Sequence, residues 1–106
     1  MITLTNYASG ELALANSEGQ DLHLTRDQAH RLVMAARMHG THDFINKIPN
    51  LISQPELAKV IATTFDGKNS SEQWNLKEKF ARLQTITKEH TPEKPDEVVD
   101  VIEFQL

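Results

Sequence analysis

The sequence predicts an α+β fold, with a small antiparallel N-terminal β-meander packed on three to four helices and a C-terminal strand. Apolar residues alternate with polar ones in residues 1–24, whereas residues 25–90 repeat apolar residues every three or four positions. A proline-containing linker, 91–95, separates this helical region from residues 96–106, where alternation returns. The 106 residues are expected to form a single domain.

The meander is expected to contain three strands joined by two tight loops. Both loops, 8–10 and 17–19, have three residues and end in Gly, which is typical of a hairpin whose last loop residue is left-handed. Because side chains alternate between the two faces of a strand, a shift of one residue would take the leucines off their common face. The expected pairs are Leu4–Leu14, Asn6–Leu12, Asn16–Gln20, Leu14–Leu22 and Leu12–Leu24.

Residues 25–40 contain the clearest helix in the sequence. Thr25 and Gln28 have the spacing of a capping box, and Gly40 is expected to take the left-handed conformation that ends many helices. The helix has one apolar stripe of small and medium residues: Ala29, Leu32, Val33 and Ala36. We expect this stripe to pack against the leucine face of the meander.

Capping residues mark the starts of the remaining helices: Thr41, Ser53 with Glu56, and Ser70 with Gln73. Pro49 is expected to end or kink the second helix near Ile48, because proline lacks the backbone N–H that a helix interior requires. The last helix is expected to run to about His90. The larger side chains at helical spacing are interpreted as core: Met34, Met38, Trp74 and Phe80.

Residues 98–106 are rich in β-branched side chains and are expected to form a strand. A strand needs a neighbour for its backbone hydrogen bonds, and the meander has free edges at 2–6 and 21–24. Pairing within the chain gives a monomer with a four-stranded sheet. Exchange with a second copy gives a strand-swapped homodimer, and the sequence leaves both open.

The net charge of −4 is unevenly distributed. Residues 1–22 carry three acidic side chains and no Lys or Arg, and residues 91–106 carry five acidic side chains and one Lys. The segment between them is mildly basic. Acidic ends disfavour nucleic acid and favour a protein partner with a basic surface. The chain has no Cys, no apolar run of membrane-spanning length and no leader, so a cytoplasmic location and no membrane contact are expected.

Enzyme activity is not expected, because the sequence lacks a Cys nucleophile and the Gly-x-Ser-x-Gly, Walker and Gly-x-Gly-x-x-Gly motifs. His39 and His42 lie on either side of a Gly turn, next to Asp43, with His23 and His30 earlier in the chain. Zinc requires three or four converging ligands, and two separated by a turn are a weak signal. We therefore expect no metal and no cofactor.

By elimination, the sequence favours a small protein-binding module, such as an inhibitor or accessory protein of the phage anti-defence or immunity type. The expected partner-binding residues are acidic: Glu11, Glu18, Glu97, Asp100 and Glu103. The alternative is a small DNA-binding regulator, since residues 26–48 resemble a helix-turn-helix. In that case the nucleic-acid contacts are expected from Lys68, Lys77, Lys79 and Arg82.

Overall fold

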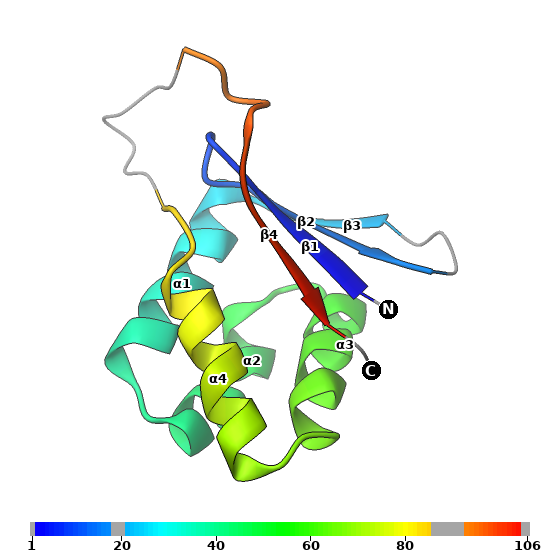
Figure 1. The fold of residues 1–106 in the computed structure, drawn as a ribbon, viewed down its shortest axis with the longest axis vertical. Coiled ribbons are helices and arrows are strands. Elements are labelled where there is room, and N and C mark those ends of the chain that lie inside the picture. Colours follow the sequence, from blue (N-terminus) through cyan, green and yellow to red (C-terminus); the bar gives the residue numbers. More distant parts are fainter. Residues whose placement is uncertain (1, 18–20, 86–92, 105–106) are drawn as a thin grey trace.

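The computed structural model describes residues 2–17, 21–85 and 93–104 (Figure 1). The fold is α+β, as predicted, with a three-stranded N-terminal meander, four helices and a C-terminal strand in the same sheet. The elements follow in the order β1 (Ile2–Tyr7), β2 (Leu12–Asn16), β3 (Asp21–Leu24), α1 (Arg26–Met38), α2 (Thr41–Leu51), α3 (Pro55–Asp66), α4 (Ser70–Ala81) and β4 (Val98–Phe104).

The predicted register of the meander is confirmed. Leu14 pairs with Leu4 on β1 and with Leu22 on β3, and Leu12 pairs with Asn6 and Leu24. Gly10 has a φ of 87°, the left-handed conformation expected at the end of the first loop. Gln20, and with it the expected Asn16–Gln20 pair, lies outside the described residues, as do positions 18–19 of the second loop.

The C-terminal strand lies beside β1 of its own chain, which gives the strand order β3-β2-β1-β4. Leu4 pairs with Ile102, whereas the register shifts after Asn6 so that Tyr7 pairs with Val98. This shift leaves Val99 as an extra residue in β4, which is the geometry of a β-bulge. Of the two edges that the meander offers, β4 therefore occupies the one formed by β1.

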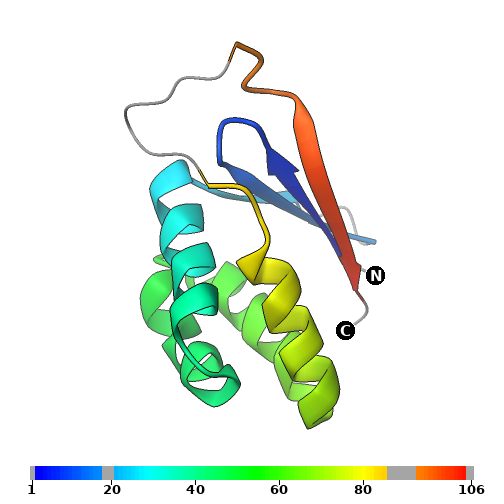
Figure 2. The same cartoon turned by 60° about the vertical axis from the view of Figure 1, so that its left-hand side comes forward.

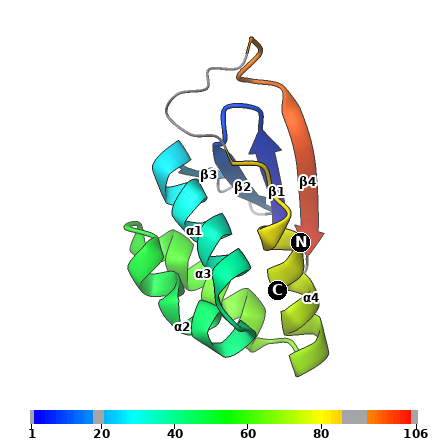
Figure 3. The ribbon, with the colours of Figure 1, turned by 90° about the vertical axis from the view of Figure 1, so that its left-hand side faces the viewer.

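All four helices lie on one side of the sheet, and the opposite face of the sheet is uncovered (Figures 2 and 3). The predicted capping box of α1 is present, because Thr25 Oγ1 accepts the Gln28 N–H at 3.3 Å and Gln28 Oε1 accepts the Thr25 N–H at 3.2 Å. The predicted stripe of α1 is buried with the inward residues of the sheet: Ile2, Leu4, Leu12, Leu14, Leu24 and Ile102. Farther from the sheet, Phe44, Phe65 and Phe80 pack with ring centroids 5.6–6.2 Å apart.

Three helix starts differ from the expected ones by one residue. Gly40 has a φ of −69° and caps α2, because α1 and α2 follow so closely that Gly40 begins the second helix instead of ending the first. Pro55 is the first residue of α3 and makes Gln54 its N-cap, while Ser53 Oγ accepts a hydrogen bond from Gln28 on α1. The α4 cap is Asn69, whose Oδ1 accepts the Glu72 N–H at 2.9 Å.

The helix end expected at Pro49 and the end expected for the last helix both differ from the structure. Pro49 is accommodated inside α2, which continues to Leu51, because proline in the last turn removes little of the helical hydrogen bonding. The last helix ends at Ala81 instead of near His90. Its end is fixed by Arg37 of α1, whose guanidinium donates to the carbonyl oxygens of Ala81 at 2.7 Å and Leu83 at 3.0 Å.

A buried asparagine holds the segment after α4 against the sheet. Asn6 on β1 is 0% exposed, and its side chain faces the helices. Its Oδ1 accepts the Gln84 N–H at 2.8 Å, and its Nδ2 donates to the Gln84 carbonyl at 3.2 Å. The amide therefore binds both backbone groups of one residue, which sets the direction in which the chain leaves α4.

Candidate protein-binding surface

The uncovered side of the sheet carries mostly small side chains. By the strand register, the outer sheet face consists of Thr3, Thr5, Tyr7, Ala13, Ala15, Asp21, His23, Val101 and Glu103. The charged residues of this face lie at its periphery, whereas threonine, alanine and valine fill its middle. The small side chains in the middle of this face allow another protein to approach the strands closely.

β4 adds exposed aliphatic surface next to this face. Val98, Val99 and Val101 are 51%, 40% and 46% exposed, although valine is usually buried. β4 is an edge strand, since within the described residues its only pairing is with β1. Exposed aliphatic side chains on an open edge are typical of surfaces that bind another protein.

Two features protect the β4 edge against pairing with a further strand. The bulge at Val99 interrupts the regular ladder. The Asp100 carboxylate accepts the Val101 N–H at 2.8 Å, which occupies an amide that an added strand would need. Charged side chains and bulges on edge strands are known to oppose edge-to-edge association. The face of the sheet is therefore a more accessible docking surface than its edge.

Among the described residues, no basic side chain forms an ion pair with the acidic side chains at the start and middle of β4. Asp96, Glu97 and Asp100 are all exposed. The ion pairs in the described part of the chain are His23–Asp21 at 3.6 Å and Lys77–Glu78 at 3.5 Å, so none neutralises these carboxylates. Their negative charge is available to a basic partner.

A hollow of about 320 Å³ lies where the β1–β2 loop meets the start of β4, and we refer to it as the hairpin hollow. It is lined by Tyr7, Ser9, Glu11, His23, Pro95 and Asp96. The two segments are joined by backbone hydrogen bonds from Ser9 N–H to the Pro95 carbonyl at 3.1 Å and from Ala8 N–H to the Glu97 carbonyl at 2.8 Å. The fold thus brings Glu11, from the acidic N-terminal part, next to Asp96, from the acidic C-terminal part.

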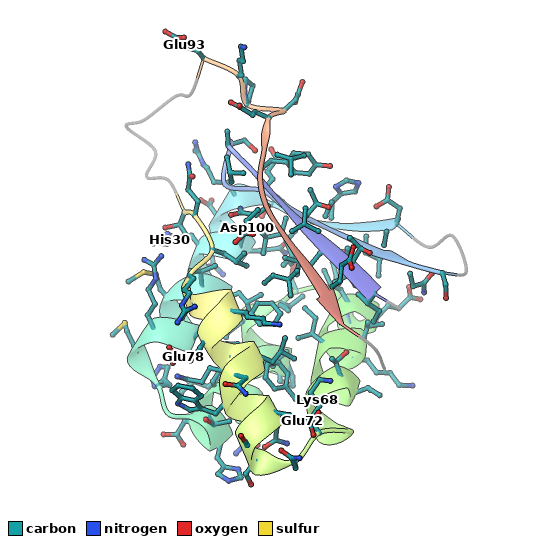
Figure 4. All side chains as sticks on the ribbon, in the orientation of Figure 1. His30, Lys68, Glu72, Glu78, Glu93 and Asp100 are labelled. Carbon is teal, nitrogen blue, oxygen red and sulfur yellow. The ribbon has the colours of Figure 1, made fainter. Side chains whose placement is uncertain are left out.

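The structure brings together only some of the acidic residues expected to bind a partner. Glu11 and Glu97 lie at the hairpin end of the sheet. Asp100 pairs with buried Asn6 and thus lies on the helix side of the strand (Figure 4). Glu103 lies at the other end of β4, where it lines a hollow of about 220 Å³ with residues of α4. Glu18 lies outside the described residues.

The four basic residues of the nucleic-acid alternative do not form one basic face. Lys77 is only 7% exposed, and its Nζ lies 3.5 Å from Glu78 Oε1. Lys68 and Lys79 line the same hollow as Glu72 and Glu103, so their charges are offset by carboxylates nearby. Figure 4 shows Lys68 and Glu72 at the same end of α4. Arg82 is exposed just after α4.

Sequence reasoning misplaced two large side chains and, of the residues that line the hairpin hollow, expected only Glu11 to bind a partner. Met38 on α1 and Trp74 on α4 are exposed and do not belong to the core, because both lie on the outward sides of their helices. Tyr7 and Asp96 line the hollow without having been expected as site residues. The sequence signal for Asp96 was its place directly after the proline linker, but its proximity to Glu11 depends on the β1–β4 pairing.

No family model matches this chain, and neither a curated protein nor a solved structure matches it. Within residues 2–17, 21–85 and 93–104, no cluster of three or more His, Asp or Glu side chains is arranged to hold a metal ion. Over the same residues, none of the helices has the length and apolar character needed to cross a membrane. The surface of the chain is therefore the basis for the functional proposal.

Proposed function

We propose that this chain is a small non-enzymatic protein-binding module that blocks a basic surface of its partner. The observation that carries this proposal is the group of exposed carboxylates, Asp96, Glu97 and Asp100, next to the exposed valines of β4. Within the described residues, none of these carboxylates forms an ion pair with Lys or Arg. Acidic side chains accelerate the encounter with a basic protein, and aliphatic side chains stabilise the complex once they are buried. An acidic inhibitor or accessory protein of the phage anti-defence or immunity type, acting in the cytoplasm, has this combination of properties.

The proposed mechanism requires no chemistry from the module itself. Occupying a basic surface is sufficient when the partner uses that surface to bind its own acidic substrate or ligand. Exposed charges on the rim of an interface mainly change the rate of association, whereas the apolar contacts mainly determine how long the complex lasts. We therefore expect the acidic residues to govern the association rate and the valines to govern the dissociation rate.

The test is capture of a partner from lysate by the immobilised chain, followed by measurement of association kinetics with the purified partner. In the double variant Glu97→Lys/Asp100→Lys, the association rate is expected to fall about tenfold or more at low ionic strength, with a smaller loss at high salt. The control variant Glu56→Lys/Asp66→Lys changes the net charge equally at exposed positions of α3. It is expected to bind at close to the parent rate.

Binding to duplex DNA, with no dependence on the acidic residues, would favour the DNA-binding alternative. In that case the chain would bind duplex DNA at about 0.15 M salt, with an affinity that falls steeply as salt is raised. Replacing Lys68, Lys79 and Arg82 by alanine would then abolish binding, whereas Glu97→Lys/Asp100→Lys would not. Lys77 is unsuited to this test because it is buried, so its replacement also changes the packing of α4.

A further inference from the structure

We infer that the partner docks on the outer sheet face and places an arginine or lysine side chain in the hairpin hollow. This inference rests on the proposed function and specifies the position and chemistry of the main contact. The hollow opens between the β1–β2 loop and the start of β4, and its lining includes the carboxylates of Glu11 and Asp96. It therefore offers a basic side chain both room and opposite charge.

The carboxylates of the hollow form no ion pair with a Lys or Arg of the described part of the chain. Among the described residues, no Lys or Arg lies within ion-pair distance of Glu11 or Asp96. A guanidinium or ammonium group that enters the hollow gains charge-assisted hydrogen bonds to a carboxylate of its lining. Tyr7 also lines the hollow, and an aromatic ring attracts a cation placed over its face. Both contacts select a cation over a neutral side chain of the same size.

The backbone around the hollow is held in place before any partner binds. Ser9 and Ala8 donate their N–H groups to the carbonyls of Pro95 and Glu97, and Glu11 N–H donates to Ser9 Oγ at 3.3 Å. Gly10 completes the loop in the left-handed conformation, which is costly for other residues. Little ordering entropy is then lost when a side chain enters, and this favours affinity.

Charge also identifies the occupant as a basic protein and not a second copy of this chain. Residues 93–104 carry five acidic side chains and Lys94 as the only basic one. Two copies placed face to face would bring two such segments together, with mutual repulsion. A basic partner removes this repulsion and gains attraction at the same positions. The small side chains around Thr5 and Ala13 allow that partner to lie close to the strands.

The first experiment uses N-acetyl-arginine amide as a probe of the full chain by NMR. Its addition is expected to shift the backbone amides of residues 7–11 and 96–97, which surround the hollow. N-acetyl-citrulline amide has nearly the same shape without the charge and is expected to cause no comparable shifts. In the double variant Glu11→Gln/Asp96→Asn, the affinity for the arginine probe is expected to fall at least tenfold. The control Glu56→Gln/Asp66→Asn, which removes two charges from α3, is expected to keep the parent affinity.

The inference is overturned if the arginine probe shifts no amides in the hollow. It is equally overturned if citrulline shifts them as strongly, or if the α3 control loses as much affinity as the hollow variant. Both variants are expected to unfold thermally near the parent midpoint. A loss of binding in a variant that is still folded then comes from the missing carboxylates.

The second experiment separates this inference from the proposed function. One outcome is a captured partner that depends on Glu97 and Asp100 and yet binds the Glu11→Gln/Asp96→Asn variant as tightly as the parent chain. That result would refute the role of the hollow and leave the proposed function standing. If lysate yields no partner while the arginine probe binds in the hollow, the proposed function fails and the site for a basic side chain stands. A partner lost in both double variants supports both proposals.

Discussion

Replacement of Asn6 by alanine is the sharpest test of how the helices are joined to the sheet. The side chain is fully buried and makes two hydrogen bonds to the backbone of Gln84, 78 positions away in the chain. Each such bond contributes about 1 kcal/mol net, and the cavity left by the shorter side chain adds to the cost. We expect Asn6→Ala to lower the free energy of unfolding by about 2–3 kcal/mol. For a domain of this size that lowers the melting temperature by about 8–24 °C.

Urea and thermal unfolding followed by circular dichroism measure both quantities. Asn46→Ala is the matched control, because Asn46 is exposed on α2, and its change is expected to stay within about 0.5 kcal/mol. Asn6→Asp provides a second comparison, since it keeps an acceptor for the Gln84 N–H but loses the donor and buries a carboxylate. We expect it to be at least as destabilising as alanine. An Asn6→Ala variant that unfolds together with the Asn46→Ala control would refute the role assigned to this side chain.

Three further predictions concern stability. Leu32→Ala is expected to lower the free energy of unfolding by about 2–5 kcal/mol because Leu32 is fully buried. A melting temperature within one degree of the parent would contradict the packing of α1 against the sheet. Arg37→Ala is expected to lower the free energy of unfolding by about 1 kcal/mol, since the carbonyls of Ala81 and Leu83 lose their donor at a partly hydrated site. Arg31→Ala should be nearly neutral in the same denaturation series. Removal of residues 96–106 uncovers the β1 edge and should lower the melting temperature or cause self-association. An unchanged melting temperature together with unchanged sedimentation would disprove the contribution of β4 to the fold.

The parts of the fold that were predictable depend on local signals that agree with one another. In the meander, the loop length, Gly10 and the spacing of the leucines all specify the same register, and the structure has that register. The capping box at Thr25 is equally local. The helix starts were harder, because Asn69 and Ser70 are both good caps and the sequence does not decide between adjacent candidates.

The features that sequence reasoning missed depend on contacts between distant parts of the chain. The end of α4 is set by Arg37 and Asn6, neither of which belongs to that helix. The same applies to the candidate surface. The acidic ends were visible in the composition, but the proximity of Glu11 to Asp96 follows only from the pairing of β1 with β4. The burial of Lys77 was not visible either, since its spacing also fits a solvated helix face.

The pairing of β4 with β1 also has a consequence during synthesis on the ribosome. Leu4 is translated 98 residues before its partner Ile102. At about 5–20 residues per second, roughly 5–20 seconds pass between the synthesis of Leu4 and that of Ile102, and the β1 edge stays unpaired over this interval. Until β4 arrives, the nascent chain exposes the open backbone groups of the β1 edge, which makes this edge a contact for a ribosome-associated chaperone.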